Sequence, residues 1–397
     1  GEVLQQIVDD FNASQDEIEI KAEYQGTYDD TITKLKAAMQ SDSGLPDVCQ
    51  MYDVGTKFMY DSGAVIPVED KFESTGYDKS SVMEVISSYY TVDGKQYAMP
   101  FNVSTPMLYY NKDVFEAAGL DPETPPTTYD EVLEDAKKIV ESGAAPVGYS
   151  QAIYGWFFEQ QLAGLGVTYG NNDNGRKEAV TAVDFDSNGG GLKVFDMWKK
   201  LYDSGYFEDY GTTTADTQTA FFSGQVGMII ESTAILKNAV DSSPFEVGTG
   251  YLPRIEQNDE GGVIIGGGSL WLTDTGNEAN EDAAWKFIEY ITTPDVQAKW
   301  SMGTGYFAIN EKAYETEDMK AYLKENPNFE TAINQLKDSP VNCNTAGVLS
   351  GVQTEARLTF NEIMPQVYDG KLTTQDAVDQ LAASVNKAIE NYNESIK

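Results

Sequence analysis

Helix-like and strand-like hydrophobic patterns alternate along this chain, and the alternation restricts its possible folds more than any other feature of the sequence. Apolar residues fall at helical spacing over 3–11, alternate with charged residues over 17–24, and return to helical spacing over 28–41. A second strand pattern follows at 47–52. Strands joined through a crossover helix pair in parallel, so we predict that 47–52 pairs with 17–24 in an α/β fold.

The length of the chain and two extended segments predict two lobes. A chain of 397 residues exceeds what one hydrophobic core usually serves. The run 99–112, punctuated by prolines, and the apolar piece 263–265 are the predicted crossings between the lobes. Lobes joined by two or three connections form a hinge with a cleft. We therefore assign 1–107 and 263–312 to lobe 1, and 108–262 and 313–397 to lobe 2.

Further helices are predicted at 113–118, 129–142, 192–203, 214–223, 279–293 and 373–396. Thr128 and Glu131 have the spacing of a capping box at the start of 129–142. The last helix has the clearest pattern, with one apolar face made of Ala377, Val378, Leu381, Ala382, Val385, Ala388 and Ile389. We expect that face to be buried.

Charge excludes two classes of partner. The chain has 27 Lys and Arg against 64 Asp and Glu, so its formal net charge is −37 at pH 7. A surface this acidic repels phosphate backbones and anionic lipids, which makes nucleic acid and membrane surfaces poor candidates. The sequence also contains no apolar stretch of the about 20 residues that a spanning helix needs.

The sequence contains no histidine, which removes the commonest general base and the commonest metal ligand. Cys49 and Cys343 fit neither a zinc pattern nor a disulfide-dense scaffold. We interpret both as small buried hydrophobic residues and leave their pairing open. We expect no metal and no cofactor. An enzyme that uses carboxylates alone stays possible, because 64 acidic residues produce many accidental pairs.

Three short motifs resemble ligand loops. Residues 184–189 match the first half of an EF-hand loop, but Phe195 stands where the bidentate Glu should be, which favours a strand, a turn and a helix cap. Residues 171–175 are rich in Asn and are interpreted as a turn. Residues 266–269, Gly-Gly-Gly-Ser, lack the phosphate-loop spacing; they are either backbone amides that face an anion or a tight strand end.

Aromatic residues lie near predicted strand ends, where open α/β sheets place ligands. Most aromatic side chains fill cores, although aromatic groups also line ligand pockets. We therefore treat each of these residues only as a candidate for ligand contact. The candidates are Tyr24, Tyr28, Tyr52, Tyr109, Tyr110, Tyr154, Trp156, Trp271 and Tyr306.

Several motifs together resemble the family 1 extracellular solute-binding proteins of ABC importers, and within that family the sn-glycerol-3-phosphate-binding proteins. They are found in the family's order and span nearly the whole chain, at 24–28, 52–56, 100–113, 119–126, 264–271 and 304–306. The resemblance implies a two-lobed periplasmic-binding-protein-like (type II) α/β fold, each lobe a mixed sheet flanked by helices, with a hinge and an interlobe cleft. It implies a receptor and not an enzyme.

The resemblance also implies what this receptor does. It captures sn-glycerol 3-phosphate, or a glycerophosphodiester such as glycerophosphocholine, and hands it to a transmembrane ABC permease. It works outside the cytoplasm as a monomer, in the periplasm or lipid-anchored at the outer face of the cytoplasmic membrane. The family begins with a strand before its first helix. This chain opens on the helix, so we expect a leader and that strand to precede Gly1, or the strand to be supplied otherwise.

The ligand residues that the resemblance implies are Tyr24, Asp53, Ser104, Trp156, Ser232, Gly267, Tyr306 and Arg357. Asp53 stands where the family usually has Glu, and its carboxylate would accept hydrogen bonds from glycerol hydroxyls. Hydroxyls, backbone amides and the Arg357 guanidinium would hold the phosphate end without a positive protein overall. Ile153 replaces the first of two family tryptophans, which predicts a wider cleft and room for a choline head against an aromatic face.

Simpler interpretations exist for these residues. Arg357 could pair at the surface with Glu355 or Glu362, Ser232 could end a strand, and Tyr306 could pack beneath the hinge. Three other functions are also open. The chain could be a carbohydrate or oligosaccharide receptor of an ABC importer, a hydrolase that uses carboxylates, or a structural surface protein without a ligand.

Overall fold

The computed structural model describes residues 1–41 and 44–396, and this part of the chain divides into two compact units. Unit 1 consists of Gly1–Ser104 and Ile265–Glu325, and unit 2 of Thr105–Ile264 and Asn326–Lys397. The boundaries thus lie after 104, 264 and 325, whereas the sequence analysis places them after 107, 262 and 312. The third boundary differs by a whole helix.

That helix, α15 (Glu317–Glu325), belongs to unit 1 because of its packing. Met319 is 1% exposed and contacts Ala298, Ala308 and Ala313, all of unit 1. The assignment of 313–325 to lobe 2 is therefore wrong. The contacts that hold this helix come from residues before it in the chain, and its own sequence pattern does not identify them.

The sheet of unit 1 is built around β10 (Gly266–Thr273). It pairs with β1 (Val48–Tyr52), β2 (Val65–Ile66) and β5 (Met99–Ser104), and β1 and β2 lie on opposite sides of it. The strand pairs described in this unit are antiparallel. Trp271 and Leu272 are fully buried, as expected of a central strand whose two faces are covered. The prediction that β1 pairs in parallel with 17–24 is wrong.

Residues 17–24 join no strand in the described chain. Side chains take the place of a neighbouring strand. The Asn12 amide bonds both to the N–H and to the carbonyl of Ile20, and the Gln15 amide does the same for Ile18. The alternation is still visible in the burial, because Ile18 and Ile20 are half-buried between exposed neighbours. An apolar alternation predicts a half-buried extended segment, but only a partner makes it a strand.

Helices flank the unit 1 sheet. They are α1 (Glu2–Ser14), α2 (Tyr28–Met39), α3 (Thr56–Asp61), α4 (Val68–Thr75), α5 (Glu84–Ser87), α13 (Glu278–Ile291) and α14 (Pro294–Thr304). A small hairpin, β3 (Thr91–Val92) and β4 (Lys95–Gln96), follows α5. The predicted helices at 3–11, 28–41 and 279–293 are confirmed as α1, α2 and α13.

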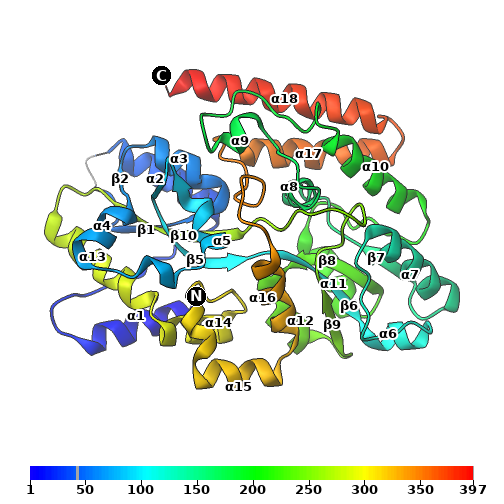
Figure 1. Cartoon of the computed structure of the whole chain (residues 1–397), viewed down its shortest axis with the longest axis horizontal. Helices are drawn as coiled ribbons and strands as arrows, with labels where there is room; N and C mark the ends of the chain where they lie inside the picture. The colour runs from blue at the N-terminus through cyan, green and yellow to red at the C-terminus, as the bar shows by residue number, and fades with distance from the viewer. Residues whose placement is uncertain (42–43, 397) are drawn as a thin grey trace. The chain divides into compact units, whose positions relative to one another are not determined.

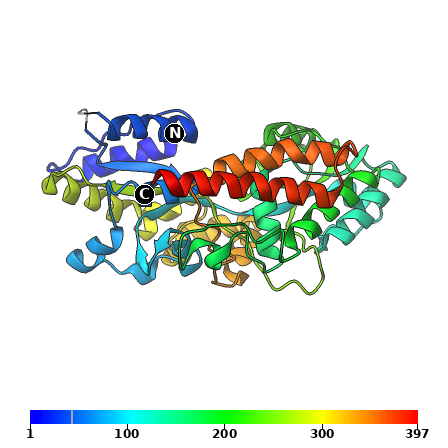
Figure 2. The same ribbon diagram turned by 90° about the horizontal axis from the view of Figure 1, so that it is seen from above.

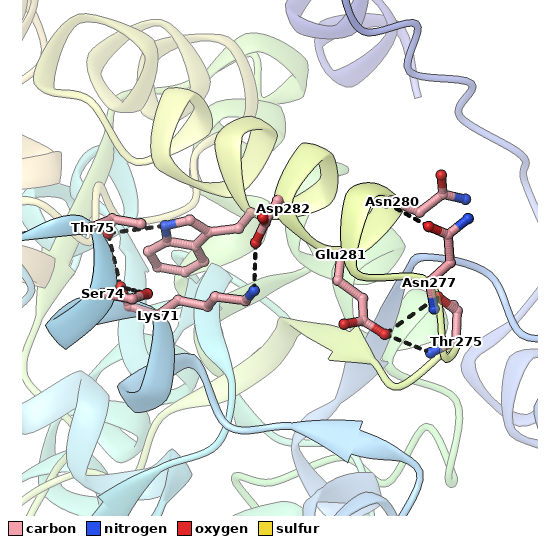
Figure 3. Close-up of polar contacts among 9 residues, drawn as sticks. Lys71, Ser74, Thr75, Thr275, Asn277, Asn280, Glu281 and Asp282 are labelled. Atoms are coloured by element: carbon pink, nitrogen blue, oxygen red, sulfur yellow. Dashed lines mark hydrogen bonds and ion pairs between the residues drawn. The ribbon is translucent and has the colours of Figure 1, made fainter.

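Polar contacts hold α13 against α4 in unit 1, as Figure 3 shows. Lys71 Nζ lies 2.7 Å from Asp282 Oδ1, and Trp285 Nε1 donates to Thr75 Oγ1 at 3.2 Å. The start of α13 is capped by Asn277, whose side chain accepts from the N–H of Asn280. The Lys71–Asp282 and Thr75–Trp285 contacts join segments more than 200 positions apart in the sequence, so they hold the two parts of this discontinuous unit together.

Unit 2 has a mixed sheet with the strand order β7-β8-β6-β9. β7 (Val147–Ser150) runs parallel to β8 (Val226–Ser232), whereas β6 (Pro106–Asn111) pairs antiparallel with β8 and with β9 (Val247–Gly250). The extended run 99–112 is therefore two strands, β5 of unit 1 and β6 of unit 2, with the crossing between Ser104 and Thr105. The second crossing falls between Ile264 and Ile265, and residues 263–265 belong to no strand in the described chain.

The helices of unit 2 are α6 (Lys112–Ala117), α7 (Tyr129–Ser142), α8 (Gly155–Gly164), α9 (Asn171–Gly175), α10 (Gly190–Asp203), α11 (Thr214–Phe222), α12 (Leu236–Ser242), α16 (Asn328–Asp338), α17 (Gln353–Tyr368) and α18 (Thr374–Ser395). Figures 1 and 2 show α17 and α18 side by side in orange and red. The predicted helices at 113–118, 129–142, 192–203, 214–223 and 373–396 are confirmed. All seven residues of the predicted apolar face of α18 are buried.

Local sequence signals were reliable in unit 2. Thr128 and Glu131 form the predicted capping box of α7. Residues 184–189 form a turn, with Gly189 at the N-cap of α10 in left-handed backbone. Residues 171–175 form one short turn in which Asn172, Asp173 and Asn174 are left-handed, a conformation that Asn and Asp tolerate better than other side chains. The turn interpretation of both segments is confirmed.

The cysteines are free thiols in the described structure, Cys49 in unit 1 and Cys343 in unit 2. Burial raises the pKa of Cys49 to about 11, which keeps this thiol protonated and unreactive at neutral pH. Cys343 is only half-buried, so the interpretation as a buried hydrophobic residue holds for Cys49 alone. Among the described residues, none of the helices combines the length and the apolar character needed to cross a bilayer.

The core of unit 2 provides a test of packing. Phe360 of α17 contacts Phe158 of α8 at 5.1 Å between ring centroids and Trp198 of α10 at 5.4 Å. We predict that Phe360→Ala lowers the free energy of unfolding by about 3–5 kcal/mol, because it leaves a cavity where three helices meet. Leu358, two positions earlier on the same helix, is 58% exposed and is the matched control. Leu358→Ala should change stability by less than about 0.5 kcal/mol in the same urea titration; equal losses for both variants would contradict this packing.

Candidate functional site

Strand register brings predicted ligand residues together at one edge of the unit 1 sheet. Gly267 at the start of β10 lies opposite Val103, next to Ser104 at the end of β5. On the other side of β10, Gly268 lies opposite Tyr52, the last residue of β1, and Asp53 follows directly. Asp53, Ser104 and Gly267 therefore share this edge, although they are far apart in the sequence.

Gly267 needs its glycine for two reasons. Its φ is +97°, in a region that other residues rarely adopt, and a Cβ built there would lie 1.9 Å from the carbonyl oxygen of Asn102. The strands β5 and β10 approach so closely at this point that a side chain does not fit. The glycine run 266–269 is thus part of a strand, which supports the strand interpretation of this motif.

Tyr306 lies beside the same edge. The N–H of Phe307 donates to the carbonyl of Val103 at 3.0 Å, which fixes the neighbouring Tyr306 next to Ser104. The half-buried ring of Tyr306 is parallel to Trp300, with 5.9 Å between centroids, and Trp300 stacks in turn on Phe101 at 4.4 Å. One side of the tyrosine ring is therefore supported by a column of aromatic side chains.

Tyr24 is the exception among the unit 1 residues. Its side chain is 90% exposed on the extended segment before α2, and the strand register does not bring it to the sheet edge. Tyr28, four residues later at the start of α2, does lie at this sheet edge. It stacks on Tyr52 with 4.9 Å between centroids, and its hydroxyl accepts from Asn102 Nδ2 at 2.8 Å.

Sequence reasoning did not single out Asn102, which organises this edge. Its Oδ1 accepts from Gln50 Nε2 at 2.7 Å while its Nδ2 donates to Tyr28. Asp53 is buried here, and both burial and the nearby Asp53 carboxylate raise the pKa of Tyr90, so this phenol keeps its proton. The edge thus combines aromatic faces, an amide and one carboxylate.

In unit 2, Ser232 ends β8 and begins a short 3-10 turn. Its Oγ accepts from the N–H of Ala234 at 3.2 Å, and its carbonyl accepts from the Tyr109 hydroxyl at 2.7 Å. The neighbouring Glu231 is buried, which raises its pKa, and it accepts from Gln218 at 2.8 Å. Because β7 and β8 are parallel, the segment that follows β7 and carries Trp156 leaves the sheet at the same edge as Ser232.

Arg357 forms a buried ion pair that the sequence did not predict. Its Nε donates to Glu159 Oε1 and its Nη2 to Glu159 Oε2, both at 2.7 Å, in a two-pronged contact between α17 and α8. Arg357 is 8% and Glu159 6% exposed. The proposed surface pairs with Glu355 and Glu362 are replaced by this one, since both of those side chains are exposed.

The two helices meet at Gly155, where a Cβ would lie 2.5 Å from the Cα of Arg357. The backbone N–H of Gly155 donates to Asn361 Oδ1 at 2.9 Å, which satisfies one of the free amides at the start of α8. This close approach places the first turn of α8, including Trp156, directly against α17.

Among the described residues, two buried polar atoms near the starts of α8 and α17 lack protein hydrogen-bond partners. Gln353, one turn before Arg357, donates to Glu159 Oε1 at 2.9 Å. In the described chain, however, Gln353 Oε1 and Trp156 Nε1 have no hydrogen-bond partner. Trp156 is 5% exposed. Buried polar atoms are nearly always bonded, so these two atoms are candidates for bonds to water or ligand, as are the six other unpartnered buried side-chain atoms of the described chain.

A signal for Glu159 was present in the sequence. It lies in the stretch Gly-Trp-Phe-Phe-Glu-Gln-Gln-Leu, and a charged residue within an otherwise apolar helix is almost never buried without a partner. The sequence could not name that partner, because Arg357 is 198 positions away.

A cavity of about 680 Å³ also lies within unit 2, lined by residues that include Tyr110, Tyr251 and Gln335. Some of its polar side chains are bonded to one another. Tyr251 donates to Asp338 at 2.7 Å, and Thr249 bonds to Thr331 at 3.1 Å. Tyr110, one of the aromatic candidates, lines it, but none of the eight ligand residues implied by the resemblance does, so it is not included in the candidate site. Within residues 1–41 and 44–396, no cluster of acidic and cysteine side chains is placed to hold a metal.

The comparison with known families supports a receptor. Residues 6–331 match the family described as bacterial extracellular solute-binding protein. The sn-glycerol-3-phosphate-binding periplasmic protein UgpB of Escherichia coli K12 is 30% identical over 404 aligned residues, covering 100% of this chain and 91% of that protein. The chain belongs to the bacterial extracellular solute-binding proteins. Proteins of this kind bind a small-molecule substrate and deliver it to an ABC permease, and they are not enzymes.

Solved structures show the fold of this solute-binding protein. UgpB from Mycobacterium tuberculosis in complex with glycerophosphocholine is similar with a TM-score of 0.83 at 20% identity, over 99% of this chain and 96% of that one. The cyclic alpha-maltosyl-1,6-maltose binding protein from Arthrobacter globiformis gives a TM-score of 0.81 at 26% identity, over 98% and 96%. The fold is therefore the two-lobed, type II periplasmic-binding-protein fold, as the resemblance implied.

The close strand contact at Gly267 yields a test. We predict that Gly267→Ala lowers the free energy of unfolding by more than about 3 kcal/mol, because the added Cβ pushes against the Asn102 carbonyl. Gly276 has a similar positive φ of +69° but open space around it, so Gly276→Ala should cost only about 1 kcal/mol. Urea unfolding of both variants measures the difference; equal costs would show that backbone conformation alone requires the glycine.

Proposed function

We propose that this solute-binding protein captures a glycerol phosphate compound, either sn-glycerol 3-phosphate or a glycerophosphodiester such as glycerophosphocholine. The observation that carries the proposal is the buried Arg357 on α17, whose guanidinium is held in a fixed two-pronged geometry by Glu159. A guanidinium in a dry environment is suited to a phosphate oxygen. The full-length similarity to sn-glycerol-3-phosphate-binding proteins supports the same ligand class.

Each unit offers groups of the required chemistry. In unit 2 the ligand residues are Trp156, Ser232 and Arg357, which provide an indole face, a hydroxyl and a cation. In unit 1 they are Asp53, Ser104, Gly267 and Tyr306, which provide a carboxylate for glycerol hydroxyls and further donors for phosphate oxygens. Tyr24, which is 90% exposed, is kept as a ligand residue on the resemblance alone.

The replacement of a family tryptophan by Ile153 supports the diester. Ile153 is buried in the core of unit 2, and the aromatic rings close to this position are those of Tyr154 and Trp156, 6.1 Å apart between centroids. A choline head placed against one of these rings would gain a cation–π contact.

The setting follows from the family. We propose that the protein acts as a monomer outside the cytoplasm, in the periplasm or lipid-anchored at the outer face of the cytoplasmic membrane, and passes its ligand to a transmembrane ABC permease. The periplasmic location of its UgpB relatives supports this setting.

A carbohydrate ligand is the second candidate function. It is supported by the similarity to the cyclic maltosyl-maltose binding protein and by the stacked pair Tyr28 and Tyr52, since aromatic faces are common in sugar sites. Calorimetric titration with sn-glycerol 3-phosphate, glycerophosphocholine and maltotriose decides between the two. We expect heat with at least one phosphate compound and none with maltotriose; the reverse result would establish a sugar receptor.

The role of Arg357 is tested by Arg357→Lys, which keeps the charge but loses the two-pronged geometry. We predict a loss of phosphate-ligand affinity of at least about tenfold. Arg254→Lys is the matched control, because Arg254 is an exposed arginine of the same unit. The control should bind like the parent protein. Unchanged affinity in Arg357→Lys, with the melting temperature preserved, would exclude the guanidinium from the phosphate site.

A further inference from the structure

A negative charge in the same unit balances the positive charge of Arg357. Glu159 receives two charge-assisted hydrogen bonds from the guanidinium, and Gln353 adds a third bond to the same carboxylate. Both partners are more than nine-tenths buried, so little water screens the pair. The pair therefore carries no net charge, although it contains the cation that the proposed ligand needs.

We propose that Glu159 is a specificity-determining residue, which makes the receptor select singly charged phosphodiesters over doubly charged phosphomonoesters. This inference rests on the proposed function. A phosphomonoester carries a charge of about −1.5 to −2 at pH 7, because its second pKa is about 6. A phosphodiester has no second acidic proton and carries only one charge.

The Glu159 carboxylate repels whatever anion approaches Arg357, and the repulsion grows in proportion to the charge of that anion. An unopposed buried arginine would favour the doubly charged ligand. An arginine already neutralised by a carboxylate gives no such advantage, while the higher cost of desolvating the dianion remains. The overall charge of −37 acts in the same direction.

Several other groups of unit 2 near Arg357 are neutral or acidic. From α17 itself, Gln353 is neutral, and Glu355 and Glu362 are exposed carboxylates that would add to the repulsion. Tyr169, from the segment before α9, interacts electrostatically with both members of the pair, and burial raises its pKa, so it is uncharged at neutral pH. Asn361 bonds to the backbone of Gly155 and is neutral.

The matched ligands for the test are sn-glycerol 3-phosphate and glycerophosphoglycerol, a diester whose second alcohol carries no cation. At pH 8 we expect the parent protein to bind the diester more tightly. Glu159→Gln keeps the shape and one acceptor but removes the charge. Because the lost repulsion scales with ligand charge, this variant should bind the diester roughly tenfold and the monoester roughly a hundredfold more tightly than the parent protein.

Asp241→Asn is the control for Glu159→Gln. Asp241 forms an exposed ion pair with Lys237 in the same unit, so this variant changes the net charge of the protein by the same amount. It should leave both affinities unchanged. If Glu159→Gln leaves the ratio of the two affinities as it is in the parent protein, Glu159 only orients Arg357 and the inference is wrong.

The pH dependence of ligand affinity in the parent protein is an independent test. It can be measured even if Glu159→Gln does not fold. As the pH falls from 8 to 5.5, the monoester gains a proton and becomes a monoanion. Its affinity relative to the diester should rise several-fold, and a fall would overturn the inference. If the parent protein binds neither phosphate compound at any pH, the proposed function itself fails, and that result is distinct from binding with the opposite preference.

Discussion

The ion pair between Glu159 and Arg357 is the constraint on which the candidate site depends. Neither charge could stay buried alone, because an unpaired ion in a protein interior costs several kcal/mol. The pair therefore holds α8 and α17 together, and Gly155 allows the helices to approach closely enough to form it. Gln353, one turn before Arg357, donates to the same carboxylate, and the first turn of α8 with Trp156 follows Gly155 directly.

Unit 1 gathers candidate residues through its strand register. Its predicted ligand residues lie at one sheet edge because β10 pairs with both β1 and β5, so the register of two strand pairs determines which side chains meet. Gly267 permits the close approach of β5, and Asn102 links Gln50 to Tyr28 across the edge. Backbone geometry dominates here, whereas side-chain charge dominates in unit 2.

Helices were predicted well from the sequence because their signals are local. The capping box of α7 and the apolar face of α18 depend on residues three or four positions apart, and both are present as predicted. The strand at 17–24 failed for the opposite reason. Its alternation was correct, but a strand needs a neighbour, and the side chains of Asn12 and Gln15 satisfy the backbone instead. The helix α15 was placed in the wrong unit because its apolar pattern does not show that it packs on the preceding segment 298–313, which belongs to unit 1.

The sequence by itself determined the fold class, the family, and most of the residues gathered in each unit, because ordered motifs and periodic patterns are properties of the chain alone. Only the tertiary structure decided that Tyr28 and not Tyr24 reaches the sheet edge, and that the charge of Arg357 is cancelled by Glu159. Both depend on contacts between distant segments. Electrostatic interaction follows distance in space, and the separation of 198 positions between Glu159 and Arg357 carried no information about the 2.7 Å between their atoms.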